Sequence, residues 1–370
     1  MPIVFGSFLL LLLLIGTIEG WSPSHFNNNH HKKNKSHKTT KACGGSSRRR
    51  FLDGVVSKTS SFGIFFLGGS ANAVYVDSKT GAALPELGEI EKAIPSDWDV
   101  ENPFLEDDPA NQSIWRRLDE TNDSIFYSTP RFVEHVDDHA VQLLTDYVTT
   151  TISNQINSNN GAPTVVLDLG ASWTSHIGGV LLGGDDAASS QQSLLKVVGL
   201  GMNEEELRSN PSLTERLVQD LNQNPILPYK DNTFTLVFCQ LTIDYLTRPL
   251  EVLKEVGRVL KPGGTVHILF SNRLFLSKVS ISHQDDKTHQ LREEARSNDF
   301  MFLRVIIGQA VGLWTGADDI DHVYTVGCYL HFCDGGFQNI VGQDLSTRKK
   351  GQKIVGDPLY VVRATKAPST

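Results

Sequence analysis

Few side chains in this sequence have the type and spacing that active-site chemistry requires. An imidazole or a phenol can accept a proton as a general base, and His176 and Tyr245 are the nearest candidates for that role. Asp321, His322 and His331 could suggest a metal site, because carboxylates and imidazoles bind metals. Isolated acidic and histidine side chains on a helix are more often packed or solvated, so we predict no metal site.

The four cysteines give little indication of chemistry. Cys239 lies in an apolar run that predicts a buried strand, where a thiol packs like a small apolar side chain. Cys328 and Cys333 are five residues apart and could form a disulfide in an oxidising compartment. A helix over both residues would instead hold their sulfurs away from bonding geometry. The sequence has no cysteine and histidine spacing typical of zinc.

The stretch from Asp220 to Asn272 has the clearest secondary-structure pattern. Two apolar runs predict strands, at residues 234–239 and 265–270. Between them, apolar residues recur every three or four positions over 249–260, and Lys-Pro-Gly-Gly at 261–264 predicts that this helix ends in a tight turn. A strand, a helix and a second strand form a right-handed parallel crossover, which predicts an α/β, doubly wound sheet.

This stretch resembles the second half of the S-adenosylmethionine-dependent methyltransferase fold, and more narrowly the type 11 group of class I methyltransferases. The motifs that carry the likeness are DNTF at 231–234, PLEVLKEV at 249–256 and RVLKPGG at 258–264. The likeness extends from Val165 to about Arg363, and its motifs mark the fold. It implies a Rossmann-like, seven-stranded, mainly parallel sheet with helices on both faces. A C-terminal antiparallel hairpin is expected over 335–344 and 358–364.

The resemblance also implies S-adenosyl-L-methionine as cofactor and a loop that would hold it. A buried strand over 164–169 contains Asp168 and is followed by Gly170, the first of the family's glycines. Ser172 and Thr174 stand where the family has further glycines, which let a cofactor approach the backbone. Ser172 adds bulk there, although its hydroxyl could donate to the cofactor's carboxylate, and Trp173 could pack or form a lid.

The next strand, over 195–200, should be followed by an acid that accepts the ribose hydroxyls. Gly201 occupies that place in this sequence. Asn203 or Glu204 could reach the ribose instead, since both side chains carry acceptors. Alternatively, Asn203 could cap a helix that begins with Glu-Glu-Glu-Leu, whose acids favour a helix N-terminus.

The third and fourth strands imply three further cofactor contacts. Asp220 occupies the place of the acid that accepts the adenine amino hydrogens, and Leu221 would offer its backbone amide. Gln240, after the fourth strand, would lie where cofactor and acceptor meet. The loops SWTSH at 172–176 and GMNEEEL at 201–207 resemble those of plant and algal plastid methyltransferase-like proteins.

The segment before the first strand predicts a helix from Ser128-Thr129-Pro130 to about Ile152, with a hydroxyl cap and a proline in its first turn. The resemblance implies that such a helix covers the cofactor, so that Tyr127, Arg131 and His135 are candidate lid contacts. A solvated helix face remains the alternative for the last two. Further on, residues 284–296 form a charged insertion, and Asp318-Asp319 could cap a helix over 320–332.

The first 73 residues resemble three targeting signals in series. Residues 8–15 are apolar and of signal-peptide length, too short to span a bilayer. Residues 21–50 contain no acid and are rich in basic and hydroxylated residues, as in transit peptides, although a basic tail that binds nucleic acid has a similar composition. SRRRFL at 47–52 resembles a twin-arginine signal, with Ala71-Asn72-Ala73 as a cleavage site. The alternative at 55–75 is a membrane anchor.

Together these signals predict a protein of the plastid, in the thylakoid lumen of an alga with a secondary plastid. Without residues 1–73, the chain has 25 basic and 40 acidic residues, a net charge of −15. Such a surface repels nucleic acid and anionic membranes, so we expect neither as a partner and no stable membrane insertion.

We therefore predict three parts: a targeting presequence over 1–73, an extended arm and lid helix over 74–160, and a methyltransferase-like domain over 161–370. The predicted function is methyl transfer from S-adenosylmethionine to a small-molecule or protein acceptor. The alternative is a catalytically inactive binding or assembly factor that kept the fold and lost the cofactor. The altered glycine loop favours the alternative, and the Asp220 region favours the enzyme.

Overall fold

The computed structural model describes residues 75–77, 79, 83–99, 102, 104, 115, 117, 119–182, 194–273, 278, 316–348, 354 and 356–368. All of them belong to one compact unit, Ser70–Thr370. The predicted targeting segment and the charged insertion at 284–296 lie outside the described residues. Within the described residues, no helix combines the length and apolar character needed to cross a membrane.

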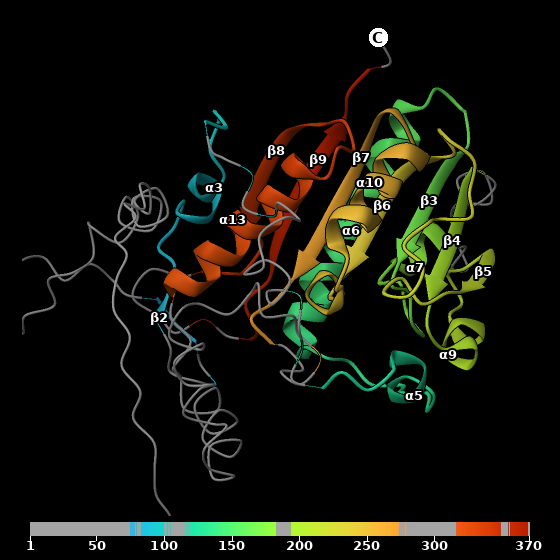
Figure 1. Ribbon diagram of the computed structural model, residues 1–370, viewed down its shortest axis with the longest axis horizontal. Helices are drawn as coiled ribbons and strands as arrows, with labels where there is room; N and C mark the ends of the chain where they lie inside the picture. The colour runs from blue at the N-terminus through green and yellow to red at the C-terminus, as the bar shows by residue number, and fades with distance from the viewer. Residues whose placement is uncertain are drawn as a thin grey trace, which may run out of the picture. The chain divides into compact units, whose positions relative to one another are not determined.

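A seven-stranded sheet forms the centre of this unit (Figure 1), in the order β5-β4-β3-β6-β7-β9-β8. β3 pairs in parallel with both β4 and β6, and β7 continues the parallel part beyond β6. β9 is antiparallel to its neighbours β7 and β8. The predicted fold class, including the C-terminal antiparallel hairpin, is confirmed. The strand bounds are Thr164–Leu169 (β3), Leu195–Gly201 (β4), Glu215–Val218 (β5), Phe234–Gln240 (β6), Leu260–Phe270 (β7), Phe337–Asp344 (β8) and Tyr360–Lys366 (β9).

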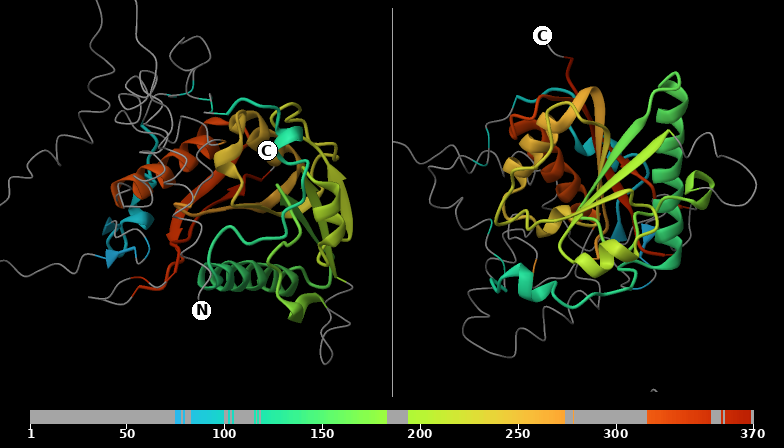
Figure 2. Two further views of the ribbon diagram at one scale, coloured as in Figure 1. Left: turned by 90° about the horizontal axis from the view of Figure 1, so that it is seen from below. Right: turned by 90° about the vertical axis from the view of Figure 1, so that its right-hand side faces the viewer.

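Helices cover both faces of the sheet, as Figure 2 shows in its edge-on view. α6 (Asp138–Ser158) lies on one face, and α10 (Pro249–Val259) and α13 (Gly316–Phe332) lie on the other. The remaining elements are short. They are β1 (Tyr75–Val76), β2 (Ala83–Leu84), α3 (Ile90–Ala93), α5 (Asp123–Phe126), α7 (Gly179–Leu182), α9 (Glu204–Ser209) and the 3₁₀ turn η1 (Ile243–Tyr245).

Alternating side chains of the strands divide the core into two layers. In β3, Leu167 and Leu169 pack with residues of α10 and α13, whereas Val166, immediately before Leu167, packs with residues of α6. Successive side chains of a strand point to opposite faces, so a strand covered on both faces must be apolar at nearly every position. This requirement explains why the strands of the parallel part appear in the sequence as continuous apolar runs.

The helix before β3 starts later than the sequence predicts. It begins at Asp138, with the side chain of Asp137 accepting a hydrogen bond from the backbone N–H of Ala140. Residues 127–137, which we call the strap, precede it in a non-helical conformation. The prediction of a helix from Ser128 is therefore wrong, because the aspartate cap at 137 prevails over the Ser-Thr-Pro signal.

Two local predictions near the helix ends are also wrong. Lys-Pro-Gly-Gly at 261–264 does not form a separate turn but belongs to β7, with a register shift against β6 between Phe234 and Leu236. Asp319 does not cap α13; it lies inside the helix, and its carboxylate accepts a hydrogen bond from the Tyr360 hydroxyl at 2.9 Å. A buried phenol needs a partner, and this tertiary contact supplies one.

Candidate functional site

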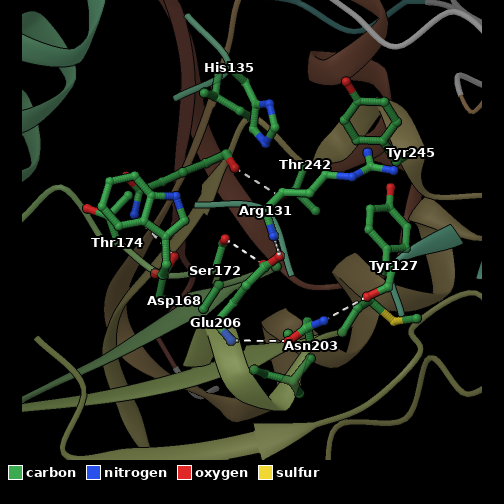
Figure 3. A pocket seen from close by; sticks show the side chains of 18 of the residues that line it. Tyr127, Arg131, His135, Asp168, Ser172, Thr174, Asn203, Glu206, Thr242 and Tyr245 are labelled. Carbon is green, nitrogen blue, oxygen red and sulfur yellow. Dashed lines mark hydrogen bonds between the residues drawn. The ribbon is translucent and has the colours of Figure 1, made fainter. Parts of the chain in front are cut away.

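A cavity of about 180 Å³ lies outside the carboxyl ends of β3, β4, β5 and β6. The strand order reverses between β4 and β6, on either side of β3, and ligands of open α/β sheets bind at such a reversal. The loops that follow these four strands form its floor, and the strap and η1 supply further lining residues. Figure 3 shows the polar side chains that converge there.

Asp168 is the most deeply placed acid of the site, with only 3% of its surface exposed. Its carboxylate accepts hydrogen bonds from the Ser175 hydroxyl at 2.6 Å and from the Gln240 amide at 3.1 Å. Burial raises the pKa of Asp168, although these two hydrogen bonds act in the opposite direction. The three side chains hold the loop after β3 against the end of β6. The structure thus brings together two predicted site residues, Asp168 and Gln240.

Gly170 occupies a conformation that favours glycine, with φ of 83°. A Cβ atom there would overlap the side chain of Thr242, so the position requires glycine for two independent reasons. Ser172, two residues on, donates its hydroxyl hydrogen bond to Glu206 Oε2 at 2.7 Å (Figure 3). Both predicted loop residues line the cavity.

The end of β4 has no room for the acid that the resemblance implies. A Cβ at Gly201 would overlap the carbonyl oxygen of Ala171 in the neighbouring loop. Asn203 caps α9, accepting from the backbone N–H groups of Glu205 and Glu206. Its amide donates to the Tyr127 and Ser128 carbonyl oxygens at 2.9 and 3.2 Å. The capping role considered from the sequence is therefore the one that the structure shows.

The acid that does reach the cavity from α9 is Glu206. Its carboxylate accepts from Ser172 and, at 2.7 Å, from the backbone N–H of Arg131. Glu204 does not line the cavity; it is exposed and pairs with Arg208. The sequence reasoning missed Glu206. Residues 203 and 206 are one helical turn apart, so a cap at Asn203 indicates that Glu206 lies on the same face of α9. Only the tertiary packing brings that face to the cavity.

Asp220 and Leu221 follow β5 and line the cavity from its other side. The Asp220 carboxylate accepts from the backbone N–H of Asn222 at 2.9 Å and from the side chain of Gln223 at 2.8 Å. A carboxylate has further lone pairs, so these bonds leave acceptor capacity for a ligand. Contact of either residue with adenine stays a prediction.

Both candidate bases line the cavity, but their surroundings differ. Tyr245 comes from η1, beside Tyr127, whose pKa is raised by burial (Figure 3). His176 has a positive φ of 49° and places its ring between two partners. Its Nδ1 lies 3.1 Å from Gln240 Oε1, and its Nε2 lies 3.2 Å from Glu134 Oε2.

The strap crosses the cavity and is bonded to its walls. The Trp173 indole donates to the Val133 carbonyl oxygen at 3.3 Å, and Glu206 accepts from Arg131. Arg131 and His135, the predicted lid contacts, line the cavity from the strap, although no helix carries them. Burial lowers the pKa of His135. These residues therefore lie at the cavity but not on a helix, and their contact with a cofactor stays a prediction.

The remaining reactive side chains lie elsewhere and have structural partners. His322 Nε2 lies 2.6 Å from the buried carboxylate of Asp244, and the ring of His331 stacks on Trp98. The part of the chain that the structure describes holds no cluster of three potential metal ligands. Cys328 and Cys333 are free, buried thiols, so the disulfide considered from the sequence does not form. Burial raises their pKa values to about 11 and 12.

Comparisons with known proteins show a match to one family over part of the chain. Residues 183–268 match the sequence model of a family described as a methyltransferase domain. The chain is 48% identical over 48 residues to the ubiquinone/menaquinone biosynthesis C-methyltransferase UbiE of Ruegeria sp. (strain TM1040), over 13% of this chain and 19% of that protein. It is 54% identical over 41 residues to the probable methyltransferase ltbC of Aspergillus luteorubrus, over 10% of this chain and 14% of that protein.

Among solved structures, a SAM-dependent methyltransferase from Aquifex aeolicus is similar, with 17% identity and a TM-score of 0.35, over 62% of this chain and 93% of that chain. The chain spans less than a fifth of the length of the two curated relatives. The family match supports a methyltransferase domain over residues 183–268 and, with it, S-adenosylmethionine as the cofactor of such a domain. The predicted bounds 161–370 stay a prediction. It identifies no methyl acceptor.

Proposed function

We propose that this chain, which carries a methyltransferase domain over residues 183–268, transfers a methyl group from S-adenosylmethionine to a small-molecule or protein acceptor. The observation that carries the proposal is the cavity outside the reversal of strand order, where residues from the ends of four strands converge. A site of this kind holds a ligand with few side chains and much backbone, which suits an adenosine-containing cofactor.

The residues present suit such a cofactor. Gly170 has no side chain, and a Cβ there would overlap Thr242, so the loop after β3 keeps a glycine at the edge of the cavity. Asp220 offers carboxylate acceptors, Leu221 a backbone amide, and Glu206 a carboxylate in the cavity where the strand-end acid is missing. When bound, the cofactor would supply an electrophilic methyl group on a sulfonium centre. The chain's own contribution would be to orient the acceptor and exclude water.

A second candidate is a binding or assembly factor without methyl transfer. It is favoured by Gly201, which cannot carry the ribose-binding acid, and by Asn203, whose amide already makes four hydrogen bonds inside the protein. Titration calorimetry of the chain with S-adenosylmethionine and S-adenosylhomocysteine separates the two. Binding of both supports the methyltransferase. No heat at millimolar cofactor, from protein shown by circular dichroism to be folded, supports the binding factor.

We also propose delivery to the thylakoid lumen of a secondary plastid, supported by the signals in residues 1–73. A fluorescent fusion of residues 1–80 should enter plastids. Changing Arg48 and Arg49 to Lys should leave the protein in the stroma if the twin-arginine route is used. A fusion found only in the endomembrane system or the nucleus would contradict this proposal.

A further inference from the structure

We propose that an oxygen anion of the methyl acceptor binds beside His176 Nε2, in the place now held by the Glu134 carboxylate, so that the acceptor is methylated on oxygen. The inference rests on the proposed methyl transfer and extends it to the chemical class of the acceptor. It starts from one histidine whose two ring nitrogens have partners of different kinds: an amide on one side and a carboxylate of the strap on the other.

The Gln240 side-chain amide fixes the orientation of the His176 ring. The Gln240 amide nitrogen donates to Asp168 Oδ1 at 3.1 Å and to the Ser175 carbonyl oxygen at 3.2 Å. Since both of these partners are acceptors, the Gln240 amide oxygen must be the atom that faces His176 Nδ1. Nδ1 therefore carries a proton and donates it to Gln240.

That assignment decides what can lie next to Nε2. A neutral ring with its proton on Nδ1 has a lone pair on Nε2, which would face the lone pairs of the Glu134 carboxylate at 3.2 Å. The contact is attractive only when one proton lies between the two atoms, as in an imidazolium–carboxylate pair. The space beside Nε2 is thus shaped for an oxygen anion paired with a protonated ring. His176 is shielded from water there, with 9% of its side chain exposed.

Glu134 is a replaceable occupant of that space. It belongs to the strap, whose two ends are fixed independently of it, by Asn203 at the Tyr127 and Ser128 carbonyl oxygens and by Asp357, which accepts from the Asp137 N–H at 2.8 Å. Its side chain is 29% exposed, so it can leave His176 for solvent without unfolding the strap ends. A ligand anion can then take its place.

The chemistry balances for an oxygen acceptor. The acceptor oxygen uses a lone pair to bond the methyl carbon, while the carbon–sulfur bond breaks and its electron pair stays on sulfur, which cancels the sulfonium charge. A carboxylate acceptor has no proton to lose. A hydroxyl acceptor gives its proton to His176 Nε2, which leaves the same oxygen anion beside an imidazolium. An ammonium group would be repelled by the protonated ring, and its nitrogen has no lone pair to accept the methyl group, so the site disfavours amines.

Binding probes test the site without knowledge of the natural acceptor. Benzoate, its neutral analogue benzamide, and benzylamine are titrated by calorimetry into the full-length chain, with and without S-adenosylhomocysteine. The hydroxyl arm uses 4-nitrophenol, whose ionisation is seen by absorbance, at a pH where the free compound is un-ionised. The variants are His176→Asn, Glu134→Gln and, as a matched control, Glu205→Gln, an exposed glutamate outside the cavity.

We expect benzoate to bind and benzamide and benzylamine not to bind. His176→Asn should weaken benzoate about tenfold or more, as for a charge-assisted hydrogen bond. Glu134→Gln should tighten it about twofold to fivefold, because a partly exposed ion pair no longer competes. Glu205→Gln should have no effect. Benzoate binding without ionisation of bound 4-nitrophenol assigns a carboxylate acceptor. Ionisation of bound 4-nitrophenol assigns a hydroxyl acceptor.

Three results would overturn the inference: preference for benzylamine, no binding of either oxygen probe, or equal probe affinities in the wild-type and His176→Asn chains. Weaker benzoate binding in Glu134→Gln would also contradict it, because it would make Glu134 part of the binding site. A different result would contradict the proposed function. If S-adenosylhomocysteine does not bind but benzoate binding still depends on His176, methyl transfer is contradicted and the oxygen-anion site is supported.

Discussion

Replacing Gly201 should test why this chain lacks an acid at the end of β4. A Cβ at this position would lie well inside 3.0 Å of the Ala171 carbonyl oxygen and at 3.2 Å from Leu207. The loop cannot withdraw freely, because the N–H groups of Gly170 and Ala171 both donate to the Leu200 carbonyl oxygen at 2.8 Å. Overpacking costs about 1–3 kcal/mol, and a lost hydrogen bond adds about 1 kcal/mol. We therefore expect Gly201→Ala to lower the free energy of unfolding by about 3 kcal/mol.

Urea unfolding followed by circular dichroism measures this change. Gly179→Ala is the matched control, since a Cβ there meets nothing within 4 Å and helical alanine is favoured over glycine by up to about 1 kcal/mol. Gly201→Asp should destabilise at least as much as Gly201→Ala and should not tighten cofactor binding. An Asp variant that is as stable as wild type and binds S-adenosylhomocysteine more tightly would refute the steric argument.

Three further predictions follow from other contacts. Glu206→Gln should weaken S-adenosylhomocysteine binding about tenfold to a hundredfold in calorimetry, because it removes the only cavity carboxylate that α9 contributes among the described residues. Glu204→Gln, the control, should leave the affinity unchanged. Asp220→Ala should weaken it by a similar factor by leaving an adenine donor unpaired, and unchanged affinity would exclude that contact. Burial acts to raise the pKa of Asp123, but hydrogen bonds from Arg117 and Asn222 hold it below the ordinary value of 3.8. The ionised carboxylate therefore adds fully to the free energy of unfolding above that pH, and this contribution is lost as the pH falls through the lowered pKa. In urea titrations, Asp123→Asn should flatten this acid dependence and lower stability at neutral pH; an unchanged pH profile would contradict it.

The elements of the sheet could be predicted because their signals are local. The apolar run at β6, the periodic helix α10 and the strand at β3 were found within a residue or two of their observed bounds. Strands buried on both faces must be apolar throughout, and a helix packed on a sheet must repeat its apolar residues every three or four positions. The start of α6 was missed because two capping signals compete there, and only packing decides between them.

Composition and motifs determined the fold class, the methyltransferase domain and most of the residues that line the cavity, because each of these depends on residues close together in the chain. Tertiary structure alone decided which acid enters the cavity and what faces His176. Glu206 meets Ser172 across 34 residues, and Glu134 meets His176 across 42. Such pairs depend on how the strap and α9 pack against the loop after β3. No periodicity or spacing in the sequence records that packing, because it arises from contacts between segments that are distant in the chain.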